Sequence, residues 1–139
     1  MKQGKLSHTG FLGNDTRPLM DILKTDDTTV HQLGLSHKDI AVKMNELLIL
    51  ALKTPGEQVK IDYELTIQAE EFRGNIPCPF GHQGLYPKNH IVAYHKRLNK
   101  YFYWSSLSIH LIKEHGFYQG IGSLYHINPK DLATILKLP

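Results

Sequence analysis

The sequence predicts an α+β fold, with helices in the first part of the chain and strands in the second. Three observations carry this prediction. Apolar residues recur at helical spacing within residues 36–54, and a segment that alternates apolar and polar residues follows at residues 59–67. Two β-rich segments separated by a polar turn then occupy residues 91–104. With 139 residues, the chain is expected to form a single domain, 1–139, around one core.

Two short helices are predicted near the N-terminus. Asp15 and Thr16 are capping residues just before Pro18, which favours a short helix at residues 18–24. The stretch "DDTTVHQLGLS" predicts a second short helix that ends at Gly34, because glycine readily adopts the left-handed conformation that closes a helix.

The longest helix is predicted to begin at Ser36 and to end before Pro55, which completes a helical part at residues 16–54. Ser36 and Asp39 approximate a capping box. A glycine between two helices also resembles a helix-turn-helix, but this helix is long and apolar toward its end, which favours a helical hairpin in the core. The face expected to be buried consists of Ile40, Met44, Leu47, Leu48 and Ala51.

The following part, residues 57–117, is predicted to contain a strand, a loop, a hairpin and a helix. Three prolines and three glycines mark "GNIPCPFGHQGLYPKNH" as the loop. Strands are expected at residues 91–94 and 101–104, followed by a helix at 105–115 that ends at a glycine and by a closing helix within 128–138. One face of the first strand is expected to carry Val59, Ile61, Tyr63, Leu65 and Ile67.

Composition and charge favour a soluble protein. Apolar residues make up 41% of the chain and charged residues 21%. The longest apolar run, residues 47–52, is too short to cross a membrane, and the first residues lack the pattern of a signal peptide. A single cysteine, Cys78, precludes an internal disulfide and suits a reducing cytoplasm. Residues 1–74 carry a net charge of −2 and residues 75–139 one of +5.

The segment "YFYWSSLSIHLIKEH" places two histidines, His110 and His115, at the end of the predicted hairpin and helix. Tyr101 and Leu107 precede them at the spacing aromatic-x5-Leu-x2-His-x4-His. These four positions resemble the second half of a Cys2His2-type ββα zinc finger, over about fifteen residues. The resemblance implies that Tyr101 and Leu107 pack together as a small core and that both histidines bind zinc.

The first half of the motif departs from that family, because Arg97 stands where a finger carries its nearer cysteine. The soft ligand available is Cys78 in "CPFGH", a tight loop that resembles a zinc knuckle with His82 in place of the second cysteine. His90 is the substitute if His82 points away. Without a metal, the histidines would be ordinary helix residues and the cysteine a small buried hydrophobe. The ligands implied by the resemblance are Cys78, His82, His110 and His115.

Apolar residues lie on several sides of the predicted helix at residues 105–115, so we expect the rest of the domain to cover it. Zinc held by four protein ligands would brace the fold, and the chain would serve as a binding or regulatory module for a protein partner. The alternative is a metal-dependent hydrolase or nuclease with an open zinc position. Glu114 or His90 would then be the general base, and a nuclease would use Asn89, His90 and His110.

Nucleic acid is a further candidate partner. The position through which a finger helix would read a base is held here by Ile109, which offers no hydrogen bond, so binding would be non-specific. Tyr118 and Tyr125 are expected to be exposed and to offer an interface for other proteins. The basic side chains that would contact phosphates are Lys88, Lys96, Arg97 and Lys100.

Overall fold

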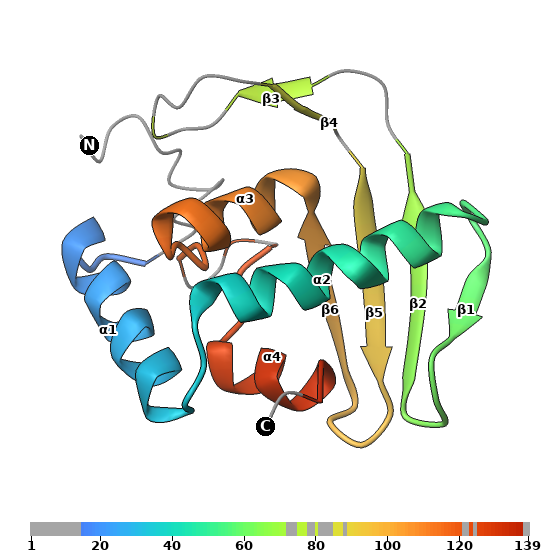
Figure 1. The fold of residues 1–139 in the computed structure, drawn as a ribbon, viewed down its shortest axis with the longest axis horizontal. Coiled ribbons are helices and arrows are strands. Elements are labelled where there is room, and N and C mark those ends of the chain that lie inside the picture. Colours follow the sequence, from blue (N-terminus) through green and yellow to red (C-terminus); the bar gives the residue numbers. More distant parts are fainter. Residues whose placement is uncertain are drawn as a thin grey trace.

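A computed structural model of the chain describes residues 15–71, 75–77, 80, 85–87, 89–120, 123 and 125–137. Its helices and its antiparallel sheet confirm the predicted α+β class (Figure 1). The helices are α1 (Leu19–Gln32), α2 (His37–Leu52), α3 (Ser106–His115) and α4 (Pro129–Ile135). The strands are β1 (Gln58–Lys60), β2 (Leu65–Glu70), β3 (Asn75–Pro77), β4 (Leu85–Pro87), β5 (His90–His95) and β6 (Lys100–Ser105).

The main sheet has the strand order β1-β2-β5-β6, and each neighbouring pair is antiparallel. Residues directly opposite one another share a face of the sheet. Ile67, Ala93 and Phe102 form one such row, and all three are buried against the helices. In Figure 1, α2 crosses in front of this face and α4 lies beside the lower end of β6, while β3 and β4 form a separate ribbon beyond one end of the sheet.

Helix α2 contributes six buried residues to the main core. Its five predicted core positions are all buried, and the capping box of Ser36 and Asp39 is present. Trp104 of β6 packs beneath the helix with no exposed surface. Its indole Nε1 donates a hydrogen bond to the carbonyl oxygen of Met44 at 3.3 Å, so that its buried N–H group has a partner.

The prediction of two short N-terminal helices is wrong, because α1 is one continuous helix. No helix breaker interrupts it, and its buried positions Leu19, Ile22, Asp26 and Val30 follow one another at helical spacing along a single face. Asp15 does not cap this helix. Its carboxylate accepts hydrogen bonds from the backbone N–H and the guanidinium of Arg17 instead.

The single strand predicted at residues 59–67 is also wrong, because a turn at residues 61–64 divides it into β1 and β2. Asp62 forms this turn by accepting the backbone N–H groups of Glu64 and Leu65 at 2.8 and 2.9 Å. Tyr63 is therefore 74% exposed and does not share the buried face. An alternating pattern does not reveal an aspartate that competes with the sheet for backbone hydrogen bonds.

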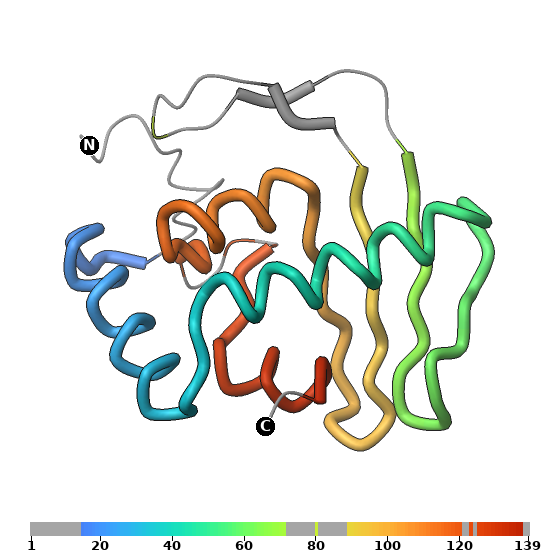
Figure 2. The backbone as a smooth tube through the Cα atoms, viewed as in Figure 1, coloured from blue at the N-terminus to red at the C-terminus, as the bar shows by residue number. Residues whose placement is uncertain are grey.

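The later elements confirm the predicted hairpin and helices. β5 and β6 pair as expected, and β6 runs directly into α3 (Figure 2). Ser105 and Ser108 form a capping box at the start of α3, and Gly116 closes the helix with a left-handed φ of 61°. Asn128 caps α4. None of the described helices is long and apolar enough to cross a membrane.

The turn at Asp62 makes stability depend on pH. The Nζ atom of Lys137 lies 2.9 Å from this carboxylate and, with the two backbone N–H groups, lowers the pKa of Asp62 to about 2. Since the folded pKa lies below the unfolded one, the stabilisation is present above about pH 4 and is lost as the pH falls toward 2.

We therefore expect Asp62→Asn to lower the melting temperature by roughly 1–3 °C at pH 7, and the difference to shrink between about pH 4 and pH 2. Circular dichroism melting curves at several pH values measure this. Glu46→Gln, which removes an exposed carboxylate from α2, is the control. A difference that stays constant down to pH 2 contradicts the assignment.

Candidate metal centre and adjoining cleft

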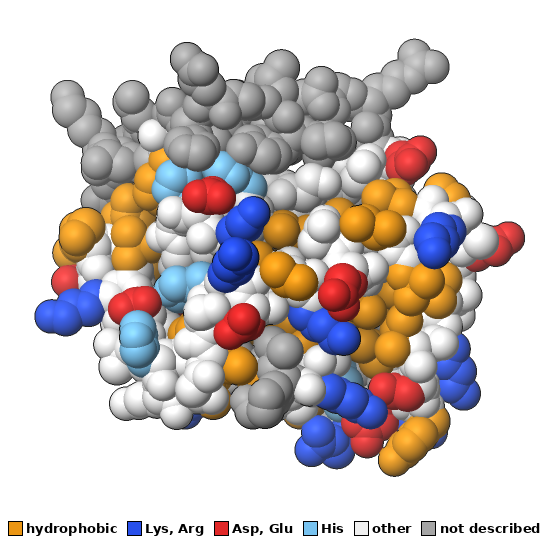
Figure 3. All heavy atoms as spheres, viewed as in Figure 1, with side chains coloured by type: hydrophobic (Ala, Val, Ile, Leu, Met, Phe, Trp, Pro, Cys, Tyr) orange, Lys and Arg blue, Asp and Glu red, His pale blue; other side chains and the backbone are white. Residues whose placement is uncertain are grey.

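His110 and His115 lie in the second half of α3, and their imidazole rings come together. The ring centroids are 5.2 Å apart and the ring planes are inclined at 80°. His110 is buried, with 9% of its surface exposed, whereas His115 is partly exposed at the last position of the helix. Figure 3 shows histidine side chains gathered where α3 lies in this view. The two histidines that the sequence singles out are thus neighbours.

The separation of these rings fits two ligands of one tetrahedral zinc ion. A Zn–N bond of about 2.1 Å puts a coordinated imidazole centroid roughly 3.2 Å from the metal. Two such rings at the tetrahedral angle have centroids about 5 Å apart. The ring centroids of His110 and His115 are 5.2 Å apart, although the two residues are five positions apart along the helix.

Phe80 connects this pair to the loop that contains the other predicted ligands. Its ring stacks on the His115 ring, with centroids 4.2 Å apart and planes inclined at 8°, and it meets Phe117 edge-on at 5.6 Å. Cys78 and His82 lie outside the described residues. Each is two residues from Phe80 along the chain.

Among the described residues, no three histidine, cysteine, aspartate or glutamate side chains form a group able to hold a metal. His90 is consequently not brought together with His110 and His115. It contacts Glu70 through Nε2 at 3.4 Å and the hydroxyl of Tyr125 through Nδ1 at 3.2 Å. The role of His90 as a substitute ligand therefore receives no support from its position.

The predicted small finger core of Tyr101 and Leu107 is wrong. Leu107 is buried among α1, α3 and Phe117, but Tyr101 is 63% exposed. The hairpin register explains the difference, because alternation on β6 turns Phe102 and Trp104 toward the core and Tyr101 toward the opposite face.

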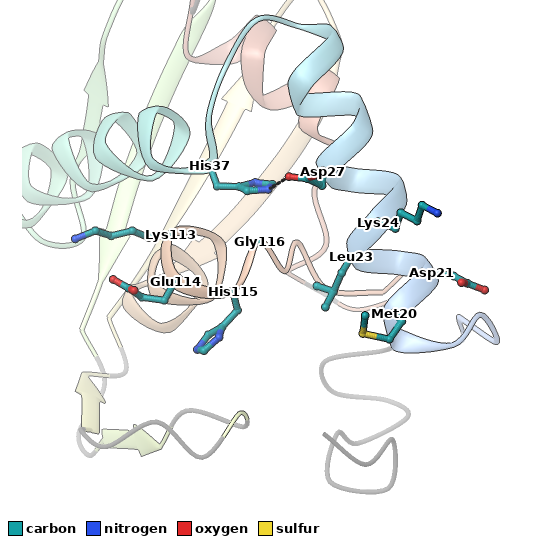
Figure 4. A pocket seen from close by; sticks show the side chains of 10 residues that line it. All are labelled: Met20, Asp21, Leu23, Lys24, Asp27, His37, Lys113, Glu114, His115 and Gly116. Carbon is teal, nitrogen blue, oxygen red and sulfur yellow. Dashed lines mark hydrogen bonds and ion pairs between the residues drawn. The ribbon is translucent and has the colours of Figure 1, made fainter.

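A cleft of about 510 Å³ lies beside the histidine pair, between α1, the start of α2 and the end of α3 (Figure 4). In this view the His37 ring points toward Asp27, while the His115 ring points toward the side on which β3 and β4 lie. The walls of the cleft carry carboxylates, amines and imidazoles together with apolar groups. Its lining includes Asp21, Lys24, Asp27, His37, Glu114 and His115.

His37 is the central polar residue of this cleft. Its Nε2 lies 2.9 Å from Asp27 Oδ1, and its Nδ1 lies 2.9 Å from the hydroxyl of Tyr118. Burial, with Asp26 and Asp27 nearby, raises the pKa of Tyr118, so the hydroxyl keeps its proton. In the neutral form of His37, Tyr118 therefore donates to Nδ1 and Nε2 donates to Asp27.

The sequence does not disclose this network. Tyr118 is 2% exposed, so the expectation that it offers an exposed interface is wrong, and Tyr125 is only partly exposed. Asp27 and Tyr118 are ten and eighty-one positions from His37 along the chain. No local spacing connects the three residues.

The same network holds the turn that follows His115. A Cβ atom placed on Gly116 would lie 2.9 Å from His37 Nε2, which is shorter than such contacts allow. Hydrogen bonds at both nitrogens keep the His37 ring in place. The ring thus packs directly against the glycine that ends α3.

Comparison of the chain with protein-family models, curated protein sequences and solved structures finds no match.

Replacing Gly116 tests the contact with His37. Both Gly34 and Gly116 have positive φ values, 73° and 61°, but a Cβ at Gly34 meets nothing within 4 Å. Gly34→Ala should cost about 1 kcal/mol of unfolding free energy through backbone strain. Gly116→Ala should cost a further ~1–3 kcal/mol from the clash, as measured by urea denaturation.

The double variant His37→Ala/Gly116→Ala isolates this clash. In the His37→Ala background, the cost of Gly116→Ala should fall to that of Gly34→Ala. Equal costs for the two glycine substitutions in the native background would show that His37 does not constrain the turn.

Proposed function

We propose that this chain is a zinc-binding protein in which Cys78, His82, His110 and His115 hold one metal ion. The observation that carries the proposal is the pairing of the His110 and His115 rings at 5.2 Å with Phe80 stacked on His115. One thiolate and three imidazoles are a suitable set for zinc, which accepts sulfur and nitrogen ligands alike.

The metal's role in this proposal is to brace the fold. Four protein ligands would close the coordination shell and join the loop around Phe80 to the end of α3. The loop is rich in proline and glycine and has few apolar residues of its own, so a metal would supply contacts that its sequence does not. A thiolate ligand also requires a reduced cysteine, which agrees with a cytoplasmic location.

The surface around the metal, where the loop at Phe80 would be joined to the end of α3, would act as a binding or regulatory module for a protein partner. The position of the cleft favours this surface as the contact region, because its wall contains both His115 and exposed side chains of α1 such as Met20, which is 72% exposed.

A metal-dependent hydrolase is the second candidate, and the cleft is the observation that favours it. Its wall includes Glu114 next to His115. If Cys78, His110 and His115 alone bound the zinc, a water molecule could take the fourth position, with Glu114 as general base.

Elemental analysis of untagged protein tests the metal site. We expect about one zinc per chain in the native protein. His115→Asn and Cys78→Ser should each lose most of it and lower the melting temperature by roughly 10 °C, because the free energy of metal binding contributes to folding. His31→Asn, on an exposed part of α1, is the control and should keep the metal.

A His82→Asn variant separates the two candidates. Zinc bound by four protein ligands should be lost or weakened in this variant, whereas a three-ligand hydrolase site should keep it. A native protein that contains no zinc and does not bind added zinc would contradict both.

A further inference from the structure

The face of the sheet opposite the helices carries three tyrosines on neighbouring strands. Tyr94 of β5 lies directly opposite Tyr101 of β6, and Tyr103 follows on the same face about 7 Å further along β6. Tyr101 is 63% exposed, and the other two are partly exposed. We call this surface the tyrosine face. Burial in the core does not explain why three tyrosines gather on this face, because the core lies on the other side of the sheet.

Two rings of the tyrosine face, those of Tyr94 and Tyr101, are held by contacts within the chain. The hydroxyl of Tyr94 donates a hydrogen bond to Asn99 Oδ1 at 2.9 Å, in the turn between β5 and β6. The rings of Tyr94 and Tyr101 are 4.8 Å apart and inclined at 49°. A stacking surface that is already ordered loses little conformational entropy when a ligand binds.

The two rows that contain these tyrosines continue across the sheet with polar residues and no carboxylate. The row of Tyr101 and Tyr94 continues through Thr66 to Lys60 at the edge of the sheet. The row of Tyr103 continues through Val92 to two glutamines, Gln68 and Gln58. Along these two rows the face combines aromatic rings, amides and a cation, and Glu70, paired with His90, lies in the next row of the same face.

In the fold, the basic residues expected to contact phosphates lie in different surroundings. Arg97 pairs with Glu64 at 3.7 Å, and Lys100 pairs with Asp131 of α4 at 3.8 Å on the helix side of the sheet. Lys88 lies outside the described residues. Lys60 lies in the row of Tyr94, and Lys96 lies in the exposed hairpin turn that follows β5.

We propose that the tyrosine face binds single-stranded nucleic acid. Unpaired bases would stack on Tyr101 and Tyr103, because every base offers a flat π-surface to an aromatic ring. Gln58 and Gln68 would bond to base edges, and Lys60 and Lys96 to phosphates. Bases inside a duplex cannot reach such rings, so the face selects single strands. This site is separate from the proposed zinc site.

Fluorescence anisotropy with labelled oligonucleotides of about twelve residues tests the proposal. The full chain should bind single-stranded RNA or DNA more tightly than a duplex of the same length, and binding should weaken as salt rises from about 50 to about 200 mM. Tyr101→Ala should reduce the affinity roughly tenfold, whereas Tyr101→Phe should retain most of it because the phenyl ring still stacks.

Two control variants test whether binding depends on the tyrosine face, or only on positive charge and on exposed apolar side chains elsewhere. Lys60→Glu should weaken binding, whereas Lys38→Glu on α2 should weaken it less, and Ile49→Ala, at an exposed apolar position of α2, should have no effect. The proposal is overturned if native protein binds no tighter than about 100 µM at low salt, or if Tyr101→Ala binds as well as native protein. It is also overturned if Tyr101→Ala instead converts a dimer to a monomer in sedimentation, since the face would then join copies of the chain.

Discussion

The structure depends on the burial of Phe102 and Trp104 in the main core, where Trp104 bonds to α2. These two residues alternate with Tyr101 and Tyr103 along β6, so the register of this one strand decides which set faces the core. A shift by one residue would bury phenol hydroxyls and expose the indole. The bond from Trp104 to the Met44 carbonyl fixes the choice, because the indole N–H finds its partner only in the observed register.

Two further features follow from this register. Because β6 leads into α3 without a loop, the strand also sets where the helix begins and which way it runs over the core. That placement brings His115 and Gly116 to His37 at the start of α2, next to the cleft. The same register puts the tyrosines on the far side of the sheet. The positions of the histidine pair and of the tyrosine face thus both follow from the register of β6.

The sequence was sufficient for features that depend on neighbouring residues. The capping box at Ser36, the hairpin, and the glycine that ends α3 all rest on chemistry within a few positions. Prediction from the sequence failed where a side chain competes with the sheet for backbone hydrogen bonds, as Asp62 does between β1 and β2. The sequence also led to the prediction of two short helices in place of α1, because polar residues in the middle of that helix conceal its single buried face.

The candidate site was predictable only in part, for a different reason. The resemblance to a zinc finger predicts that His110 and His115 bind one metal ion, and their rings do lie together. The zinc-finger motif led to a wrong position for Tyr101, because the register of β6 turns Phe102 and Trp104 toward the core and Tyr101 away from it. The network of Asp27, His37 and Tyr118 comes from distant parts of the chain, and only the folded structure brings it together.

X-ray absorption spectroscopy at the zinc edge of the purified protein is the most direct test of the proposed metal centre. The account predicts one sulfur at about 2.3 Å and three imidazole nitrogens at about 2.0 Å around the metal. A shell without sulfur, or one made mainly of oxygen, would contradict it.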